Sequence, residues 1–134
     1  MRLLLLLLAG VFLSSCGSID TPLEPLTPAE PVYRKISGAE AREIMDTTAD
    51  FILLDVRTDE EFAEKRIDGS ILIPDYEIAD RAELELSDKH ALILIYCRRG
   101  RRSALAANEL VDLGYTNVYD FGGLEDWEFE TVSD

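Results

Sequence analysis

The sequence predicts an α/β domain whose open parallel sheet is flanked by helices on both faces. Strand-like and helix-like stretches alternate along the chain from residue 32 onward. One stretch, Ala91–Tyr96, is apolar except for a single hydroxyl, which is typical of a strand buried on both faces of a parallel sheet. Parallel neighbours need crossover connections, and the helices that make these crossovers cover both faces of the sheet.

The domain is expected to begin with a strand followed by a capped helix. Val32–Ile36 is a short candidate for the first strand. Ser37 stands three residues before Glu40, and this spacing is the capping box that starts many helices. We therefore expect a first helix that ends near Asp46.

A second strand–helix pair follows in the same order. Phe51–Val56 is apolar except for Asp55, which indicates a buried strand with one polar residue near its carboxyl end. Thr58 and Glu61 repeat the capping-box spacing. The second helix is therefore expected to be short and to end near Lys65.

The middle of the domain contains a short strand and a longer helix. Ser70–Ile73 is a strand candidate that ends at Pro74, because proline has no N–H group to donate to a neighbouring strand. Tyr76–Leu86 has apolar residues at helical spacing and is expected to be a helix. The buried strand Ala91–Tyr96 comes next.

The domain is expected to close with a helix, a strand and a final short helix. Ser103–Leu113 has an apolar stripe at helical spacing, and Gly114 fits the cap at its carboxyl end. Asn117–Phe121 is the last strand candidate. Gly122-Gly123 indicates a turn, and Leu124–Phe129 would form the closing helix.

The first part of the chain has the features of a targeting signal followed by a lipidation site. An apolar run, Leu3–Leu13, follows Arg2. At about 1.5 Å per residue, this run reaches about half of the ~30 Å needed to cross a bilayer, which favours a signal peptide over residues 1–15. The run ends in Leu13-Ser14-Ser15-Cys16, which resembles the lipobox of bacterial lipoproteins.

That resemblance implies that Cys16 carries lipid and that the protein is a membrane-anchored lipoprotein of the bacterial cell envelope, facing the periplasm or the exterior. Two or more acyl chains hold a protein stably on a membrane. Residues 16–31 would then be the lipidated cysteine and a linker, and residues 32–134 the domain. The linker has a proline at every third position, a period that suits polyproline II. These prolines are Pro22, Pro25, Pro28 and Pro31.

Charge and cysteine content exclude several kinds of partner and site. The formal net charge is −14, with 27 acidic and 13 basic residues, so the phosphates of a nucleic acid would be repelled. Cys16, Cys97 and the single histidine His90 do not supply the ligands of a zinc site. Once Cys16 carries lipid, Cys97 has no second thiol to pair with, so no disulfide is expected in the mature monomer.

Four arginines follow the only thiol of the domain within five positions. The segment Cys97–Ser103 leads from the end of the most buried strand, through a basic turn, to the start of a helix. N–H groups at a helix start are unpaired, and a loop that curls over them forms a nest that binds an anion. Gly100 supplies the backbone freedom for a tight curl.

A thiol at the centre of such a nest is stabilised as the thiolate, which is the nucleophilic form. A buried structural cysteine beside a basic surface turn is the alternative interpretation. However, clustered arginines repel one another unless an anion or carboxylates occupy them, and ligands of open parallel sheets bind beyond the carboxyl ends of the strands. We therefore predict a nucleophile at Cys97. The residues expected to bind an anion are Arg98, Arg99, Gly100, Arg101, Arg102 and Ser103.

The segment Cys97–Ser103 resembles the active-site loop of single-domain rhodaneses, a cradle of six residues that starts with cysteine and has an arginine near its end. Further motifs agree with this family in order and spacing over nearly the whole domain. They are Asp55-Val56-Arg57, Glu60-Glu61-Phe62, Ile67–Ile71, Ile73-Pro74, Gly114-Tyr115, Val118-Tyr119, Gly122-Gly123 and Trp127. Two departures are Lys65-Arg66, where the family usually has glycine-histidine, and the extra basic residues Arg99 and Arg101.

The rhodanese resemblance implies a sulfurtransferase. Cys97 would take the outer sulfur of a small anionic donor such as thiosulfate, hold it as a persulfide and pass it to cyanide or a thiol. Arg98 and Arg102 would help to place the sulfonate of the donor. From their own positions, Asp55 and Arg57 are expected to form a structural ion pair near the loop that supports the site, and a direct role in substrate binding is the alternative. The resemblance implies no metal and no organic cofactor.

Two other functions fit the same residues. A phosphatase or arsenate reductase of rhodanese topology also has a cysteine cradle with an arginine, but its loop is one residue longer than the spacing from Cys97 to Arg102. The domain could also be a non-enzymatic persulfide carrier or docking module, since a fold does not by itself fix a function.

Overall fold

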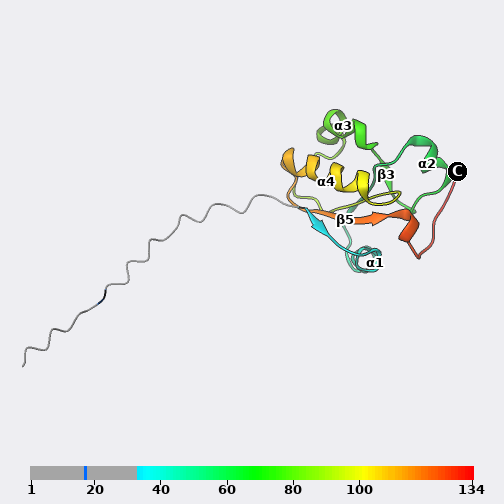
Figure 1. Ribbon diagram of the computed structural model, residues 1–134, viewed down its shortest axis with the longest axis horizontal. Helices are drawn as coiled ribbons and strands as arrows, with labels where there is room; N and C mark the ends of the chain where they lie inside the picture. Colours follow the sequence, from blue (N-terminus) through cyan, green and yellow to red (C-terminus); the bar gives the residue numbers. More distant parts are fainter. Residues whose placement is uncertain (1–16, 18–32) are drawn as a thin grey trace, which may run out of the picture.

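A five-stranded parallel sheet with the strand order β1-β5-β4-β2-β3 forms the centre of the domain (Figure 1). The computed structural model describes residue 17 and residues 33–134. The predictions of a signal peptide, of lipid on Cys16 and of a proline-rich linker therefore lie outside the described residues, apart from Gly17. The strands are β1 (Arg34–Lys35), β2 (Ile52–Asp55), β3 (Ile71–Leu72), β4 (Ile93–Cys97) and β5 (Val118–Gly123).

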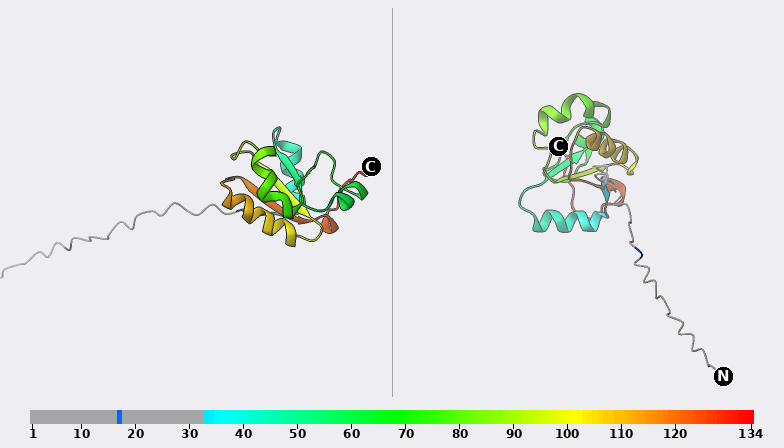
Figure 2. Two further views of the ribbon diagram at one scale, coloured as in Figure 1. Left: turned by 90° about the horizontal axis from the view of Figure 1, so that it is seen from above. Right: turned by 90° about the vertical axis from the view of Figure 1, so that its left-hand side faces the viewer.

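Helices connect the strands and cover the sheet on both sides, as the sequence predicts (Figure 2). Within the described part of the chain, no helix is long and apolar enough to cross a membrane. The α-helices are α1 (Gly38–Thr47), α2 (Asp59–Glu64), α3 (Ile78–Glu85) and α4 (Arg101–Asp112), and the 3₁₀ helices are η1 (Asp75–Glu77) and η2 (Leu124–Asp126).

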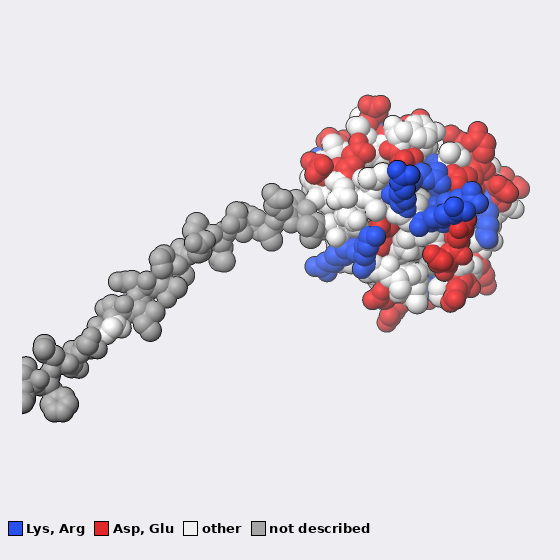
Figure 3. Space-filling model, viewed as in Figure 1, with Lys and Arg blue, Asp and Glu red and all other residues white. Residues whose placement is uncertain are grey.

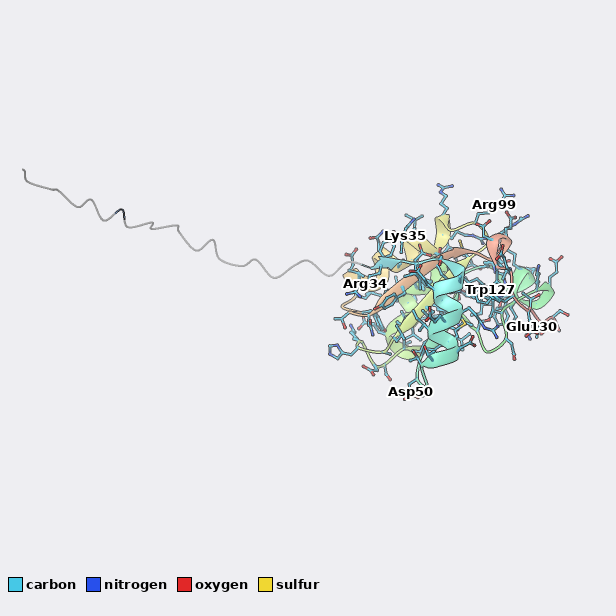
Figure 4. All side chains as sticks on the ribbon, turned by 90° about the horizontal axis from the view of Figure 1, so that it is seen from below. Arg34, Lys35, Asp50, Arg99, Trp127 and Glu130 are labelled. Carbon is cyan, nitrogen blue, oxygen red and sulfur yellow. The ribbon has the colours of Figure 1, made fainter. Side chains whose placement is uncertain are left out.

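Alternate residues of the fully buried strand β4 supply two separate cores. Ile95 and Cys97 face α3 and α4, whereas Leu94 and Tyr96 face α1 and the C-terminal segment. On the α1 side, Trp127 lies against the start of that helix (Figure 4). The apolar run of β4 therefore fills both faces of the sheet, as expected for a central parallel strand.

Both predicted capping boxes are confirmed. The hydroxyl of Ser37 accepts a hydrogen bond from the N–H of Glu40 (3.1 Å), and the Glu40 carboxylate accepts one from the N–H of Ser37 (2.7 Å). Thr58 and Glu61 make the same reciprocal pair at 3.2 and 3.1 Å. Local side-chain bonds thus start α1 and α2 at the predicted residues.

The predicted end of the domain needs correction. Gly122-Gly123 is not a turn, because both glycines belong to β5 and Gly123 is in register with Cys97 on β4. The predicted helix Leu124–Phe129 is reduced to η2, since the chain beyond it runs extended to an antiparallel bridge between Arg66 and Val132. The carboxyl end of β5 therefore lies directly beside the thiol.

Candidate active site

The predicted cradle joins the last residue of β4 to the first turn of α4. The loop packs closely on β5, because a Cβ atom at Gly123 would lie 2.4 Å from the carbonyl oxygen of Arg98 and 2.6 Å from the Cα atom of Arg99. Gly100 has a φ of +96°, a left-handed conformation that glycine adopts without strain. Two glycines therefore shape the curl of the loop, one within it and one beneath it.

One main-chain N–H group of the loop points at the sulfur of Cys97. The N–H of Gly100 donates to the Sγ atom at 3.0 Å. Within the described residues, the N–H groups of the other loop residues make no hydrogen bond, so they are available to an anion. They belong to Arg98, Arg99, Arg101, Arg102 and Ser103. Cys97 itself is only 1% exposed, which restricts access to small reactants.

The arginines of the loop spread away from the sulfur toward carboxylates. Arg98 and Arg99 both bind Glu125 on η2, with Nε–O distances of 2.9 and 3.0 Å. Arg102 binds Glu61 on α2 through two parallel bonds of 2.8 and 2.9 Å. Basic side chains gather on the front of the domain, with acidic ones around them (Figure 3). Carboxylates thus reduce the mutual repulsion of the arginines, which is one of the two explanations that the sequence left open for their clustering.

These ion pairs lower the pKa values of the two carboxylates, Glu61 and Glu125. Hydrogen bonds from Arg102 outweigh the effect of burial and lower the pKa of Glu61 to about 2. Hydrogen bonds from Arg99 and Arg98 lower the pKa of Glu125. The same bond to Glu61 raises the pKa of Arg102, so this pair stays ionised at neutral pH.

Asp55 and Arg57 form the predicted ion pair, which is buried at the end of β2. The Arg57 Nη2 atom lies 2.6 Å from Asp55 Oδ2, and the two side chains are 5% and 0% exposed. The same nitrogen donates to the carbonyl oxygen of Lys65 at 2.6 Å. Burial opposes the charge on Arg57, but its bonds to Asp55 prevail and raise the pKa of the guanidinium. The pair fixes the β2–α2 connection beside the loop.

A pocket of about 290 Å³ opens next to the loop, between α2 and η2. Arg57 and Arg98 belong to its wall, whereas Cys97 does not. Its lining residues are Arg57, Glu61, Glu64, Lys65, Arg98, Leu124 and Glu125. Among the described residues, no three His, Cys, Asp or Glu side chains are arranged to hold a metal ion.

Behind the sulfur lies a polar pair of which only one member was predicted. Ser103 is fully buried, and its Oγ atom lies 3.5 Å from Cys97 Sγ and 2.8 Å from Asp120 Oδ1. Asp120 is missing from the predicted site because a single acidic residue in the strand Val118–Gly123 has no distinctive sequence pattern. Glu61 and Glu125 were also not predicted as partners of the loop, because each lies far from it in sequence.

Comparison with known proteins agrees with this architecture. The family model of the rhodanese-like domain matches residues 37–130. The chain is 37% identical over 73 residues to thiosulfate sulfurtransferase PspE of Escherichia coli, covering 54% of this chain and 70% of that protein. It is 31% identical over 98 residues to thiosulfate sulfurtransferase GlpE of Coxiella burnetii, covering 72% and 89%.

Solved structures give the same result. A rhodanese-related protein from Thermoplasma volcanium superimposes with a TM-score of 0.66 at 28% identity, over 76% of this chain and 100% of the other. An Escherichia coli rhodanese with anions gives a TM-score of 0.58 at 34% identity, over 62% and 98%. Since these two chains consist almost wholly of the matching region, we expect residues 33–134 to fold without the segment that precedes them. The chain belongs to the rhodanese-like domain family, whose members include sulfurtransferases.

Proposed function

We propose that the protein transfers a sulfane sulfur from a small anionic donor such as thiosulfate to cyanide or a thiol, through a persulfide on Cys97. The observation that carries this proposal is the buried sulfur at the start of the loop, which accepts a hydrogen bond from the N–H of Gly100, while the other loop N–H groups make no backbone hydrogen bond among the described residues. Preset donors around a developing negative charge are a large part of catalysis in many enzymes. The relationship to two thiosulfate sulfurtransferases supports the choice of donor.

The transfer proceeds in two displacements. The Cys97 thiolate attacks the outer sulfur of thiosulfate, a new S–S bond forms, and the old S–S bond breaks with its electron pair leaving on sulfite. The acceptor then attacks the outer sulfur of the persulfide and leaves the Cys97 thiolate. Free N–H groups of the loop hold the negative persulfide sulfur between these steps.

The arginines act as an electrostatic guide in this proposal. Arg98, Arg99 and Arg102 are already paired with carboxylates, so we expect them to attract a donor and turn toward it rather than to form a fixed sulfonate site. Arg101 is exposed and has no ion pair within the described residues, which leaves it available to the donor. The E. coli relative is described as a rhodanese with anions, which supports an anionic ligand for this chain.

The test uses residues 33–134 with thiosulfate and cyanide and measures thiocyanate. We expect turnover in the wild type and none in Cys97→Ser. Mass spectrometry after thiosulfate alone should show a gain of one sulfur atom in the wild type only. A wild type that neither turns over nor gains sulfur would contradict the proposal.

Two other outcomes identify the alternatives. A stable persulfide with negligible turnover for cyanide and several thiols would indicate a carrier rather than an enzyme. Hydrolysis of a phosphate ester without any gain of sulfur would indicate a phosphatase. The spacing from Cys97 to Arg102 favours sulfur, since four residues lie between them.

We also propose that the chain works at the bacterial cell envelope, anchored through lipid on Cys16. The support is the run Leu3–Leu13 and the lipobox-like Leu13-Ser14-Ser15-Cys16. Expression of the full chain with radiolabelled palmitate should label the wild type and leave Cys16→Ser unlabelled. Equal labelling of both proteins, or of neither, would contradict this anchoring.

A further inference from the structure

A buried carboxylate that the transfer scheme does not use lies behind the cradle. Asp120 on β5 is 2% exposed. Within the described residues, no arginine, lysine or histidine forms an ion pair with it. A buried carboxylate is costly to ionise unless it is paired, so this position requires an explanation.

Asp55, the other buried aspartate, has the ion-pair partner that Asp120 lacks among the described residues. Asp55 accepts a hydrogen bond from the N–H of residue 57 at 2.9 Å, and Asp120 accepts one from the N–H of residue 122, also at 2.9 Å. At Asp55 the residue two positions later is an arginine whose guanidinium completes an ion pair. At Asp120 it is a glycine, and the remaining donor is the hydroxyl of Ser103.

The single proton of the Ser103 hydroxyl has a preferred acceptor. The Oγ atom lies 2.8 Å from Asp120 Oδ1, 3.1 Å from the carbonyl oxygen of Gly100 and 3.4 Å from that of Gly122. Hydrogen bonds to ionised acceptors are shorter and stronger than those to neutral ones, so the proton points to Asp120. Ser103 Oγ can then act only as an acceptor toward Cys97. The S–H group of Cys97 donates to it at a distance of 3.5 Å.

The positive groups on the elements around this chain of atoms do not pair with Asp120. On β1, Lys35 is in register with Asp120 but is exposed and forms no ion pair with it. On α4, the guanidinium of Arg102 is directed to Glu61. On the loop, the N–H of Gly100 points at the sulfur.

We propose that Asp120 is the proton acceptor of Cys97, reached through Ser103. Before Cys97 attacks, its S–H proton moves to Ser103 Oγ and the Ser103 hydroxyl proton moves to Asp120 Oδ1, which leaves Cys97 as the thiolate. The S–S bond forms and sulfite leaves as described above. When an acceptor has taken the outer sulfur, the proton returns to Cys97 by the reverse path. Asp120 is a positioning residue in this scheme, because it acts through Ser103 and touches no substrate.

This inference rests on the proposed function, but a measurement that needs no sulfur transfer tests it. Residues 33–134 contain Cys97 as their only cysteine, so the rate of its alkylation by iodoacetamide can be followed from pH 4 to pH 9. If one proton is shared between Cys97 and Asp120, the wild type keeps a plateau of reactivity at acidic pH. In Asp120→Asn the proton must leave to solvent, so the rate should fall about tenfold per pH unit below its midpoint.

Matched variants separate the relay from a general effect on structure. Ser103→Ala should remove the plateau as Asp120→Asn does, and the double variant should match either single one. Ser103→Thr keeps the hydroxyl and should keep the plateau. Asp112→Asn, the same change at the exposed end of α4, should leave the profile unchanged.

The outcomes are distinct. A plateau that persists in Asp120→Asn, or that is absent from the wild type, overturns the relay even if thiocyanate is formed. If Asp120→Asn does not fold, as judged by the fluorescence of Trp127, the comparison of Ser103→Ala with Ser103→Thr decides. Failure of the sulfurtransferase proposal would instead appear as a wild type that keeps the plateau but forms no persulfide.

Discussion

Single residues in the interior of this domain depend on specific partners for their charge. Asp55 and Arg57 are both nearly inaccessible to water, and each bonds to the other and to the main chain. Removing one member of such a pair leaves the other charge buried without compensation. The pair therefore contributes mainly by fixing the β2–α2 connection, and its loss is best measured as stability.

We expect Arg57→Met to lower the free energy of unfolding by about 3–5 kcal/mol, because the Asp55 carboxylate stays buried without its cation. Urea titrations of residues 33–134 measure this change through the single tryptophan, Trp127. The double variant Asp55→Asn/Arg57→Met removes both charges and should lose less than Arg57→Met alone. A loss below about 1 kcal/mol in Arg57→Met, within the range of an exposed pair, would contradict the argument.

Sequence could identify some residues of the site and not others, for physical reasons. Cys97 and its loop could be predicted because a thiol, a glycine and clustered arginines stand together in the chain. Asp120 could not, since its importance comes from its burial behind Ser103 and from the absence of an ion pair to it among the described residues. Burial and pairing across the sheet are properties of the fold and leave no local pattern.

At the level of elements, one ion pair joins two helices that flank the cradle. Arg102 in the first turn of α4 binds Glu61 in α2, with side chains 29% and 24% exposed. Glu61 also takes part in the capping box of α2 through the N–H of Thr58. The carboxylate thus stabilises the start of its own helix and ties it to the loop.

Because of this pair, we expect the free energy of unfolding of the domain to depend on pH. The pKa of Glu61 is about 2 in the folded protein, below its ordinary value of 4.5. Its contribution is therefore fully present above about pH 4.5 and is lost as the pH falls toward 2. Glu61→Gln keeps a capping side chain and should be less stable than the wild type by about 1–3 kcal/mol at pH 6.

Urea titrations at pH 6 and pH 3 test this expectation. The difference in unfolding free energy between the wild type and Glu61→Gln should shrink by about half at pH 3. Arg102→Gln should behave in the same way, since it removes the other partner. A difference that stays constant between the two pH values would show that Glu61 does not act through its charge.

Elements were predictable where the signal is local. Both capping boxes set the starts of α1 and α2 as expected, and the apolar run of β4 marked the central strand. Gly122-Gly123 misled the prediction because paired glycines usually indicate a turn. Here Gly123 is required by the close approach of Arg98 and Arg99 to β5, a contact between distant parts of the chain.

At the scale of the whole molecule, a basic loop lies on a strongly acidic protein. The formal net charge is −14, which repels a dianionic donor at long range. At physiological ionic strength the Debye length is about 8 Å, so the charges on distant faces are largely screened. The arginines of the loop then determine the field that a donor meets close to the sulfur.

If sulfur transfer occurs as proposed, kcat/KM for thiosulfate should fall as ionic strength rises from about 0.1 to 0.5 M, because salt screens the attraction of the loop. Arg99→Gln/Arg101→Gln should lower kcat/KM and flatten this dependence. Arg42→Gln on α1, which removes a positive charge from another element, should follow the wild type. Steady-state thiocyanate assays give all three curves, and identical salt slopes would exclude steering by the loop.

Parallel strands also give the domain a front and a back. All five run the same way, so the cradle occupies one end while β1 begins nearer the other, and Arg99 and Arg34 lie far apart (Figure 4). A tether joined ahead of β1 would therefore hold the domain by its rear and turn the mouth of the cradle outward. If the chain is anchored as proposed, small donors and acceptors could then approach from open solution without meeting the membrane.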